Sequence, residues 1–224
     1  LCLRKRGVSA ILVSSGAIKA GRAAMATKAK NGEIAGLQAL AAVGQVALME
    51  AYRDIMAELG LTVAQILLTW DDFRNKKRLR NLMNTINGLI QMGVVPIINE
   101  NDTIAVDEIK FGDNDTLSAL VAKYMQADLL VLLSDIDGLY SGDPSSRDSK
   151  LITGVKAISA EIERLVSQRH GGFGGMATKL KAAGIANEAG IPLIIANSST
   201  ERVVERIIDG ENIGTIFLPR DQNE

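Results

Sequence analysis

The sequence holds one cysteine and one histidine among its 224 residues. A lone Cys2 excludes an internal disulfide and a cysteine-built metal site, and it is compatible with a reducing compartment. A lone His170 argues against a multi-histidine zinc centre and against a Ser–His–Asp hydrolase. We therefore expect a cytoplasmic protein whose site is built from other residue types.

Strong charge of either sign is also missing. The formal net charge is −1, so no basic field favours a nucleic acid and no basic stripe favours a membrane surface. No apolar run reaches the ~18 residues of a membrane span, and nothing resembles a signal peptide. With 47% hydrophobic residues and 4% aromatic ones, the composition is that of an ordinary soluble globular chain.

Short apolar runs alternate with segments of helical periodicity along the chain. The runs predict strands within 8–13, 61–69, 94–99, 128–134, 191–198 and 213–219. The spacing of apolar residues predicts helices over 34–59, 70–93, 115–127, about 158–168, 177–190 and 201–209. Strands that alternate with helices indicate a mostly parallel sheet with helices on both faces.

Clusters of polar residues follow four of the predicted strands, at 14–16, 99–102, 134–138 and 197–199. In open parallel sheets, ligands bind outside the carboxyl ends of the strands. The convergence of these clusters on that edge is the main sign of a binding site that the residues give by themselves.

A further polar cluster, "GDND" at 112–115, precedes the predicted helix over 115–127. Asp115 has the chemistry of an N-cap and Gly112 that of a turn residue. Capping explains only one of the polar residues in the cluster, so a role in binding remains open beside the structural one.

The stretch "GGFGGMATK" at 171–179 places four glycines before Lys179. It predicts either a backbone cradle for phosphate at a helix N-terminus or a surface turn followed by a solvated lysine. Its spacing is not that of a Walker A loop or of GxGxxG. The stretch "SDIDGLYSGDP" from Ser134 onwards is similarly open between a turn and a nucleotide-binding loop.

Six ordered motifs carry a resemblance to a known family: "VSSGAI", "QALAAVGQ", "PIINENDT", "FGDNDTLSALVA", "LLSDIDGLYSGDP" and "GGMATKLKAA". Together they resemble the amino acid kinase family, and within it the kinases of L-glutamate, from about Val8 to Pro219. The resemblance implies a three-layer α/β/α sandwich around a mainly parallel sheet, with a kinase domain over 1–219 and a tail over 220–224. It also implies ATP-dependent phosphorylation of the glutamate γ-carboxylate to γ-glutamyl 5-phosphate, the first step of proline biosynthesis.

The resemblance also implies roles for individual residues. Ser15, Gly16, Asp102 and Asn114 match the family's substrate contacts. Lys179 matches a catalytic lysine, and Asp115 matches the aspartate that orients the catalytic lysines. The residues that match the family's ATP contacts are Ser134, Asp135, Phe173, Gly174, Gly175, Met176, Ala177, Thr178 and Lys179. Mg²⁺ is expected to bind with the nucleotide, without a metal cage of protein side chains.

The implied chemistry fits the scarcity of histidine. A glutamate side chain has a pKa of about 4.3, so at neutral pH it is already a carboxylate and needs no general base. Phosphoryl transfer then depends on positioning and on neutralising the charge of the transferring group. Lys179, the amides of the glycine loop and Mg²⁺ would supply that neutralisation.

Two features of the family have no counterpart in the sequence: an opening strand with a glycine-rich loop of "K-x-G-S-S" character, and a C-terminal RNA-modification-type domain. We expect from the first that the sequence is a fragment whose activity is reduced. The resemblance further implies a homo-oligomer, dimer or tetramer, and transfer of the product to glutamyl phosphate reductase.

Other functions remain open. One is a non-catalytic module or partner subunit that binds glutamate or proline. Others are kinases of the same family that act on aspartate, N-acetylglutamate, carbamate or UMP. The "NENDT" and "GDND" clusters together with "GGMATK" favour the kinase of glutamate. A Rossmann dehydrogenase is disfavoured, because no GxGxxG follows a strand.

Overall fold

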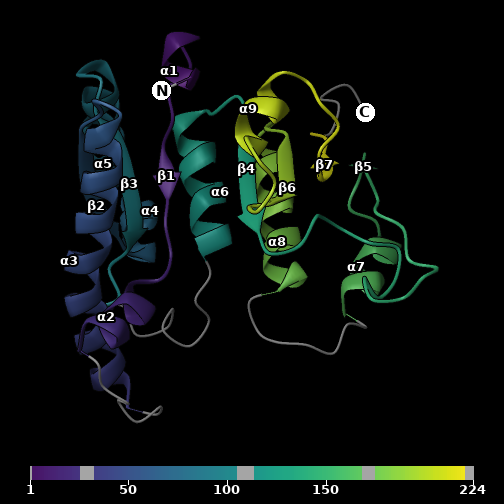
Figure 1. Cartoon of the computed structure of the whole chain (residues 1–224), viewed down its shortest axis with the longest axis horizontal. Coiled ribbons are helices and arrows are strands. Elements are labelled where there is room, and N and C mark those ends of the chain that lie inside the picture. Colours follow the sequence, from purple (N-terminus) through teal and green to yellow (C-terminus); the bar gives the residue numbers. More distant parts are fainter. Residues whose placement is uncertain (1, 26–32, 105–113, 168–174, 220–224) are drawn as a thin grey trace. The chain divides into compact units, whose positions relative to one another are not determined.

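The computed structural model describes residues 2–25, 33–104, 114–167 and 175–219. The chain forms two compact units, Leu1–Asn114 and Asp115–Glu224. Each unit contains its own sheet (Figure 1).

The first unit is built on three parallel strands in the order β1-β3-β2. They are β1 (Leu12–Val13), β2 (Val63–Leu68) and β3 (Val95–Glu100), each inside its predicted segment or within one residue of it. Ile97 and Ile98 of β3 are almost fully buried, as expected for the central strand of a parallel sheet. The helices of this unit are α1 (Cys2–Lys5), α2 (Ala17–Met25), α3 (Ile34–Glu58), α4 (Trp70–Arg74) and α5 (Lys76–Gln91).

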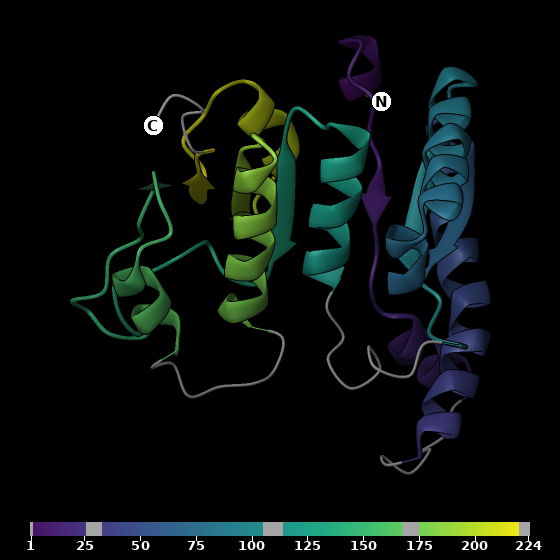
Figure 2. The ribbon, with the colours of Figure 1, turned by 180° about the vertical axis from the view of Figure 1, so that it is seen from behind.

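Helices α2 and α3 pack against each other (Figure 2), and glycine residues lie at their contact. A Cβ atom on Gly44 would lie 1.7 Å from the backbone oxygen of Ala17, and one on Gly21 would lie 1.9 Å from the backbone oxygen of Leu40. The two helix backbones are therefore in direct contact, which no larger residue would permit. This contact fixes the first turn of α2, which directly follows Ser15 and Gly16.

One predicted helix, over 70–93, is two helices in the structure. Asn75 ends α4 and begins α5 in an extended conformation, and its Oδ1 accepts hydrogen bonds from the backbone nitrogens of Lys77 and Arg78 at 3.0 and 3.1 Å. Side-chain capping of this kind competes with helix continuation. The amphipathic pattern runs through both helices, so periodicity alone does not reveal the break.

Of the helices that the structure describes, α3 alone has the length and composition of a membrane span. It has 25 residues, a mean hydropathy of 1.4 in its most apolar window, and 22% of that window buried. The sequence was expected to hold no apolar run of that length, and polar residues such as Gln45 do interrupt α3. The helix meets the composition criterion because its mean hydropathy stays high despite these interruptions. Core helices of soluble proteins meet the same two criteria, and α3 packs Leu40, Ala41 and Gly44 inside the unit.

The second unit contains a mixed sheet in the order β4-β6-β7-β5. Its strands are β4 (Leu130–Ser134), β5 (Gly154–Val155), β6 (Leu193–Asn197) and β7 (Thr215–Phe217). The pairs β4–β6 and β5–β7 are parallel, and β6–β7 is antiparallel. No sequence pattern indicated β5, which has two residues, or the reversed direction of β7, since direction leaves no mark on an apolar run.

Helix α8 (Met176–Glu188) supplies much of the core of this unit. Its Ala182, Ala183 and Ala186 are fully buried with Leu193 and Ile195 of β6. Because alanine side chains are small, this face of α8 can pack closely against the sheet. The other helices are α6 (Asn114–Met125), α7 (Ala160–Ser167) and α9 (Val203–Ile208); α6 begins at the last residue of the first unit.

The contact between α2 and α3 gives a test of the first unit. Replacing Gly44 with alanine places a Cβ atom 1.7 Å from a backbone oxygen, so we expect Gly44→Ala to lower the free energy of unfolding by about 1–3 kcal/mol. Gly36 lies in the same helix, and a Cβ atom added there would have nothing within 4 Å, so Gly36→Ala should raise stability by up to about 1 kcal/mol. Urea unfolding of both variants measures the difference, and equal effects would contradict the close packing.

Candidate active site

A cavity of about 510 Å³ lies in the first unit, next to the carboxyl ends of β1 and β3. Its wall combines carboxylate, amide, hydroxyl and basic side chains with the first turn of α2. The lining residues are Ser15, Gly16, Ala17, Ile18, Lys19, Arg22, Leu37, Asn99, Glu100, Asp102 and Asn114. The structure therefore brings together all four residues predicted to contact substrate: Ser15, Gly16, Asp102 and Asn114.

The turn at Gly16 shapes one side of this cavity. Gly16 has φ +99°, a conformation that favours glycine. Its carbonyl accepts the first hydrogen bond of α2, from the Ala20 nitrogen at 2.8 Å. The first N–H groups of a helix have no partner within it and carry the positive end of its dipole. The cavity thus meets a helix N-terminus that suits an anion.

Asn114 lines the cavity, but its amide nitrogen is committed elsewhere. Its Nδ2 donates to the backbone oxygen of Ser14 at 2.8 Å and to Oδ1 of Asn99 at 3.2 Å. The amide oxygen of Asn114 is then the atom that remains for a ligand, and it accepts hydrogen bonds. This geometry suits a ligand that brings a donor, such as an ammonium group.

Reasoning from the sequence gave no individual role to several polar residues of the cavity wall, among them Asn99, Lys19 and Arg22. Asn99 is 3% exposed, and its Nδ2 has no hydrogen-bond partner among the described residues. A buried donor without a partner costs free energy, so an acceptor on a ligand would stabilise it. Lys19 and Arg22 lie on α2 at a spacing of three residues, which places them on one face. Their spacing and the position of Asn99 in the "NEND" cluster were visible signals.

The second unit holds a cluster around Asp115. Its Oδ2 accepts a hydrogen bond from Thr178 Oγ1 at 2.7 Å and pairs with Lys179 Nζ at 3.1 Å. The side chains of Lys179 and Asp115 are only 11% and 23% exposed. The expectation that Asp115 caps α6 is wrong: it is the second residue of the helix, and its carboxylate bonds to α8 instead.

The N-cap of α8 is Gly175, and no side chain of the described residues caps the helix. The N–H groups of its first turn, over Met176, Ala177 and Thr178, have the chemistry to bind an anion. Lys179 adds a positive charge in the same turn. Phe173 and Gly174, the other predicted ATP contacts in this stretch, lie outside the described residues.

Ser134 and Asp135, also predicted to contact the nucleotide, end β4 and begin the loop after it. Ser134 Oγ lies 3.2 Å from Asp135 Oδ1, and Asp135 is exposed. The loop is held from its other end by Asp137, which accepts hydrogen bonds from Tyr140 at 2.7 Å and from Asn197 at 2.9 Å. These bonds, that of Tyr140 first, hold the pKa of Asp137 below its ordinary value.

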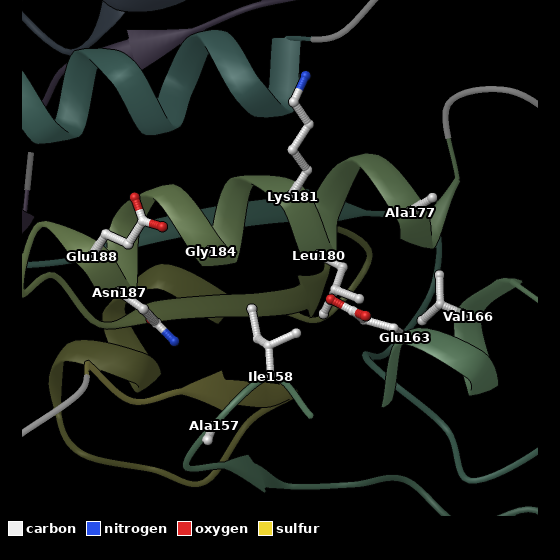
Figure 3. Close-up of a pocket in the computed structure, with 10 residues that line it drawn as sticks. All are labelled: Ala157, Ile158, Glu163, Val166, Ala177, Leu180, Lys181, Gly184, Asn187 and Glu188. Atoms are coloured by element: carbon white, nitrogen blue, oxygen red, sulfur yellow. The ribbon is translucent and has the colours of Figure 1, made fainter. Parts of the chain in front are cut away.

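A second cavity, of about 490 Å³, lies in the second unit between α7 and α8 (Figure 3). Most of its wall is apolar, and the amide of Asn187 is directed towards Ile158, whereas Lys181 and Glu188 project away from it. Ala177 lines it, but Lys179 and Asp115 do not. It is therefore distinct from the Asp115 cluster.

Comparison with protein families identifies the class of protein. Residues 2–197 match the model of the amino acid kinase family. The match extends over far more than half of the chain, and the chain belongs to this family.

Curated relatives show which kinases of this family the chain resembles. The glutamate 5-kinase of Clostridium acetobutylicum is 47% identical over 98% of this chain and 84% of its own length. That of Clostridium tetani is 50% identical over 96% of this chain and 82% of its own length. The chain covers 58% of the glutamate 5-kinase of Trichlorobacter lovleyi, to which it is 49% identical. The resemblance carried by the motifs is thus confirmed.

Solved structures support the fold. Carbamate kinase from Giardia lamblia bound to AMP-PNP matches 97% of this chain and 86% of its own with a TM-score of 0.63 and 20% identity. The isopentenyl phosphate kinase of T. acidophilum matches 92% of this chain and 82% of its own with a TM-score of 0.60 and 17% identity. The amino acid kinase-like α/β fold predicted from the sequence is confirmed.

The Asp137 contacts make a prediction about pH. We expect Tyr140→Phe to raise the pKa of Asp137 towards its ordinary value, and Asn197→Ala to raise it less, because the Tyr140 bond is the larger cause. A carboxyl with a lowered folded-state pKa stabilises the fold above its unfolded-state pKa and loses this effect as pH falls through the folded-state pKa. In Tyr140→Phe the total loss should therefore be smaller, and it should be complete at a higher pH, because the folded-state pKa lies closer to the unfolded-state pKa. Titration of the Asp137 carboxyl carbon by NMR measures the pKa, and an unchanged value would contradict the assignment.

Proposed function

We propose that the protein phosphorylates the γ-carboxylate of L-glutamate with ATP, giving γ-glutamyl 5-phosphate, the first step of proline biosynthesis. The observation that carries this proposal is the buried Lys179, paired with Asp115 at the N-terminus of α8, which no side chain of the described residues caps. A fixed cation beside the first N–H groups of a helix suits the phosphates of a nucleotide. The names of the relatives specify the acceptor.

The cavity of the first unit has the chemistry to bind glutamate. Asp102 and the amide oxygen of Asn114 suit the α-ammonium group, by charge-assisted hydrogen bonding. Ser15, the first turn of α2 and Nδ2 of Asn99 suit a carboxylate. Asn99 supports the proposal strongly, because its buried donor gains the acceptor that it lacks among the described residues.

The residues of the second unit would act on the nucleotide. The first turn of α8, Ser134 and Asp135 would bind it, with Phe173 and Gly174 as further predicted contacts. Lys179 would neutralise the charge that spreads over the transferring phosphoryl group, and Asp115 would hold its ammonium group in place. No residue has to remove a proton, because the acceptor is already a carboxylate at neutral pH.

Mg²⁺ would enter with the phosphates of ATP. Among the described residues, no cluster of three or more His, Cys, Asp and Glu side chains could hold a metal by itself. When bound, the ion would neutralise phosphate charge.

We place the protein in the cytoplasm as a homo-oligomer. Helix α3 exposes Val43, Val46 and Ile55, apolar side chains that a second copy could cover. Sedimentation of the protein as a monomer at assay concentration would contradict the homo-oligomer.

The acyl phosphate product hydrolyses readily, which favours transfer to glutamyl phosphate reductase. Equal pathway flux with the two enzymes kept apart would contradict transfer.

The reaction is tested by trapping the product. The protein, incubated with Mg–ATP and hydroxylamine, should form hydroxamate from L-glutamate and not from aspartate or N-acetylglutamate. Acyl phosphates react with hydroxylamine, whereas carboxylates do not under the same conditions. Absence of hydroxamate from glutamate would refute the kinase and leave a non-catalytic glutamate-binding module as the better explanation.

The same assay tests the role of the Asp115 pair. Asp115→Asn keeps the size of the side chain but removes the charge that holds Lys179. We expect kcat to fall by roughly 100-fold, the loss typical of one misplaced preorganised charge or donor, with a smaller change in KM for glutamate. Asp128→Asn removes an exposed carboxylate from the same unit and should leave kcat unchanged. Equal kcat values for the two variants would contradict the role of Asp115.

A further inference from the structure

Ser14 lies beside the glutamate cavity without forming part of its wall. It is 6% exposed, and its polar groups are all engaged. Its nitrogen donates to the Ile98 oxygen at 2.8 Å, and its carbonyl oxygen accepts from Asn114 Nδ2 at 2.8 Å. Ser14 therefore joins β1, β3 and a cavity residue at a single point.

The hydroxyl of Ser14 is the middle of a chain of hydrogen bonds. Tyr52 donates its O–H to Ser14 Oγ at 2.9 Å, and Ser14 Oγ donates to the Ser15 carbonyl oxygen at 3.2 Å. Because Ser14 accepts from tyrosine, its own proton is directed to Ser15. Successive hydrogen bonds of this kind strengthen one another. The chain runs from α3 to the residue that precedes Gly16.

Tyr52 comes from a helix that is itself firmly placed. Gly44, two turns earlier on α3, contacts the Ala17 backbone of α2. Helix α3 thus holds both sides of the 14–17 turn: Gly44 fixes where α2 begins, and Tyr52 fixes the serine at the end of β1.

We propose that Tyr52 is a positioning residue for the acceptor substrate. It acts through Ser14, which orients the Ser15 carbonyl and presents its own carbonyl to the Asn114 amide. Loss of the tyrosine hydroxyl leaves the Ser14 hydroxyl free to rotate. The backbone turn that carries Ser15 and Gly16 then becomes less rigid. This role rests on the proposed function, because it concerns binding of glutamate in the same cavity. It assigns Tyr52 no contact with the substrate.

The test is a double-mutant cycle of Tyr52→Phe and Ser14→Ala. Each single variant should lower kcat/KM for glutamate by about fivefold, the net worth of one hydrogen bond, and leave KM for ATP within about twofold. The double variant should be no worse than Ser14→Ala alone, because the two residues act in one chain. Additive losses, or equal changes in KM for both substrates, would overturn the proposal.

Thr85→Val is the matched control. It removes a hydroxyl that bonds to the Asn81 oxygen on α5 at 2.9 Å, at an exposed position of the same unit. It should leave kcat/KM for glutamate unchanged, which separates the Tyr52 effect from a general loss of hydrogen bonding. A fall equal to that of Tyr52→Phe would overturn the proposal.

Hydrogen exchange distinguishes failure of this proposal from failure of the proposed function. In Tyr52→Phe, exchange of the Ser14 and Ala20 amides should speed up by about fivefold relative to Thr85→Val. These amides form the bonds to Ile98 and Gly16, and their exchange needs no substrate. If the unaltered protein makes no hydroxamate, the proposed function fails, and faster exchange then shows only that Tyr52 positions the 14–17 turn. Unchanged exchange overturns the positioning role itself, whether or not hydroxamate forms.

Discussion

The ion pair between Lys179 and Asp115 is the interaction on which the proposed chemistry depends. Burying an ammonium group is costly unless a carboxylate and hydrogen bonds compensate, and Asp115 also accepts the Thr178 hydroxyl. Two contacts from consecutive residues of α8 fix the carboxylate, so the position of the Lys179 charge is fixed as well. A charge placed in advance stabilises a transition state more effectively than a mobile one.

The two sets of site residues use the same device in different units. Helix α2 begins after Gly16 and helix α8 begins after Gly175, and a glycine at the start of a helix brings no side chain to its N–H groups. Each helix then adds a basic residue near its start, Lys19 on α2 and Lys179 on α8. An acid with two carboxylates and a nucleotide with three phosphates are both anions, and both can be bound in this way.

Much of the fold and of the site could be predicted because local chemistry determined it. Apolar runs predicted β2, β3, β4 and β6. The polar cluster after β3 and the "GDND" cluster marked the cavity that contains Asp102 and Asn114. The break at Asn75 was missed because an amphipathic pattern continues across it. The local pattern predicted that Asp115 caps a helix. It could not reveal the true partners of Asp115, Thr178 and Lys179, because they are more than 60 residues away in the sequence. The contact of Tyr52 with Ser14 likewise depends on tertiary packing, which no local pattern records.

The most direct test of the central claim follows the oxygen atoms of the acceptor. The protein would be given ATP, hydroxylamine and L-glutamate labelled with oxygen-18 in its γ-carboxylate, and the released phosphate would be examined by ³¹P NMR. Hydroxylamine attacks the carbonyl carbon of an acyl phosphate, so the phosphate departs with the bridging oxygen. We predict one oxygen-18 in each phosphate that accompanies a hydroxamate. Unlabelled phosphate, formed in the amount of the ADP, would show that glutamate is not the acceptor.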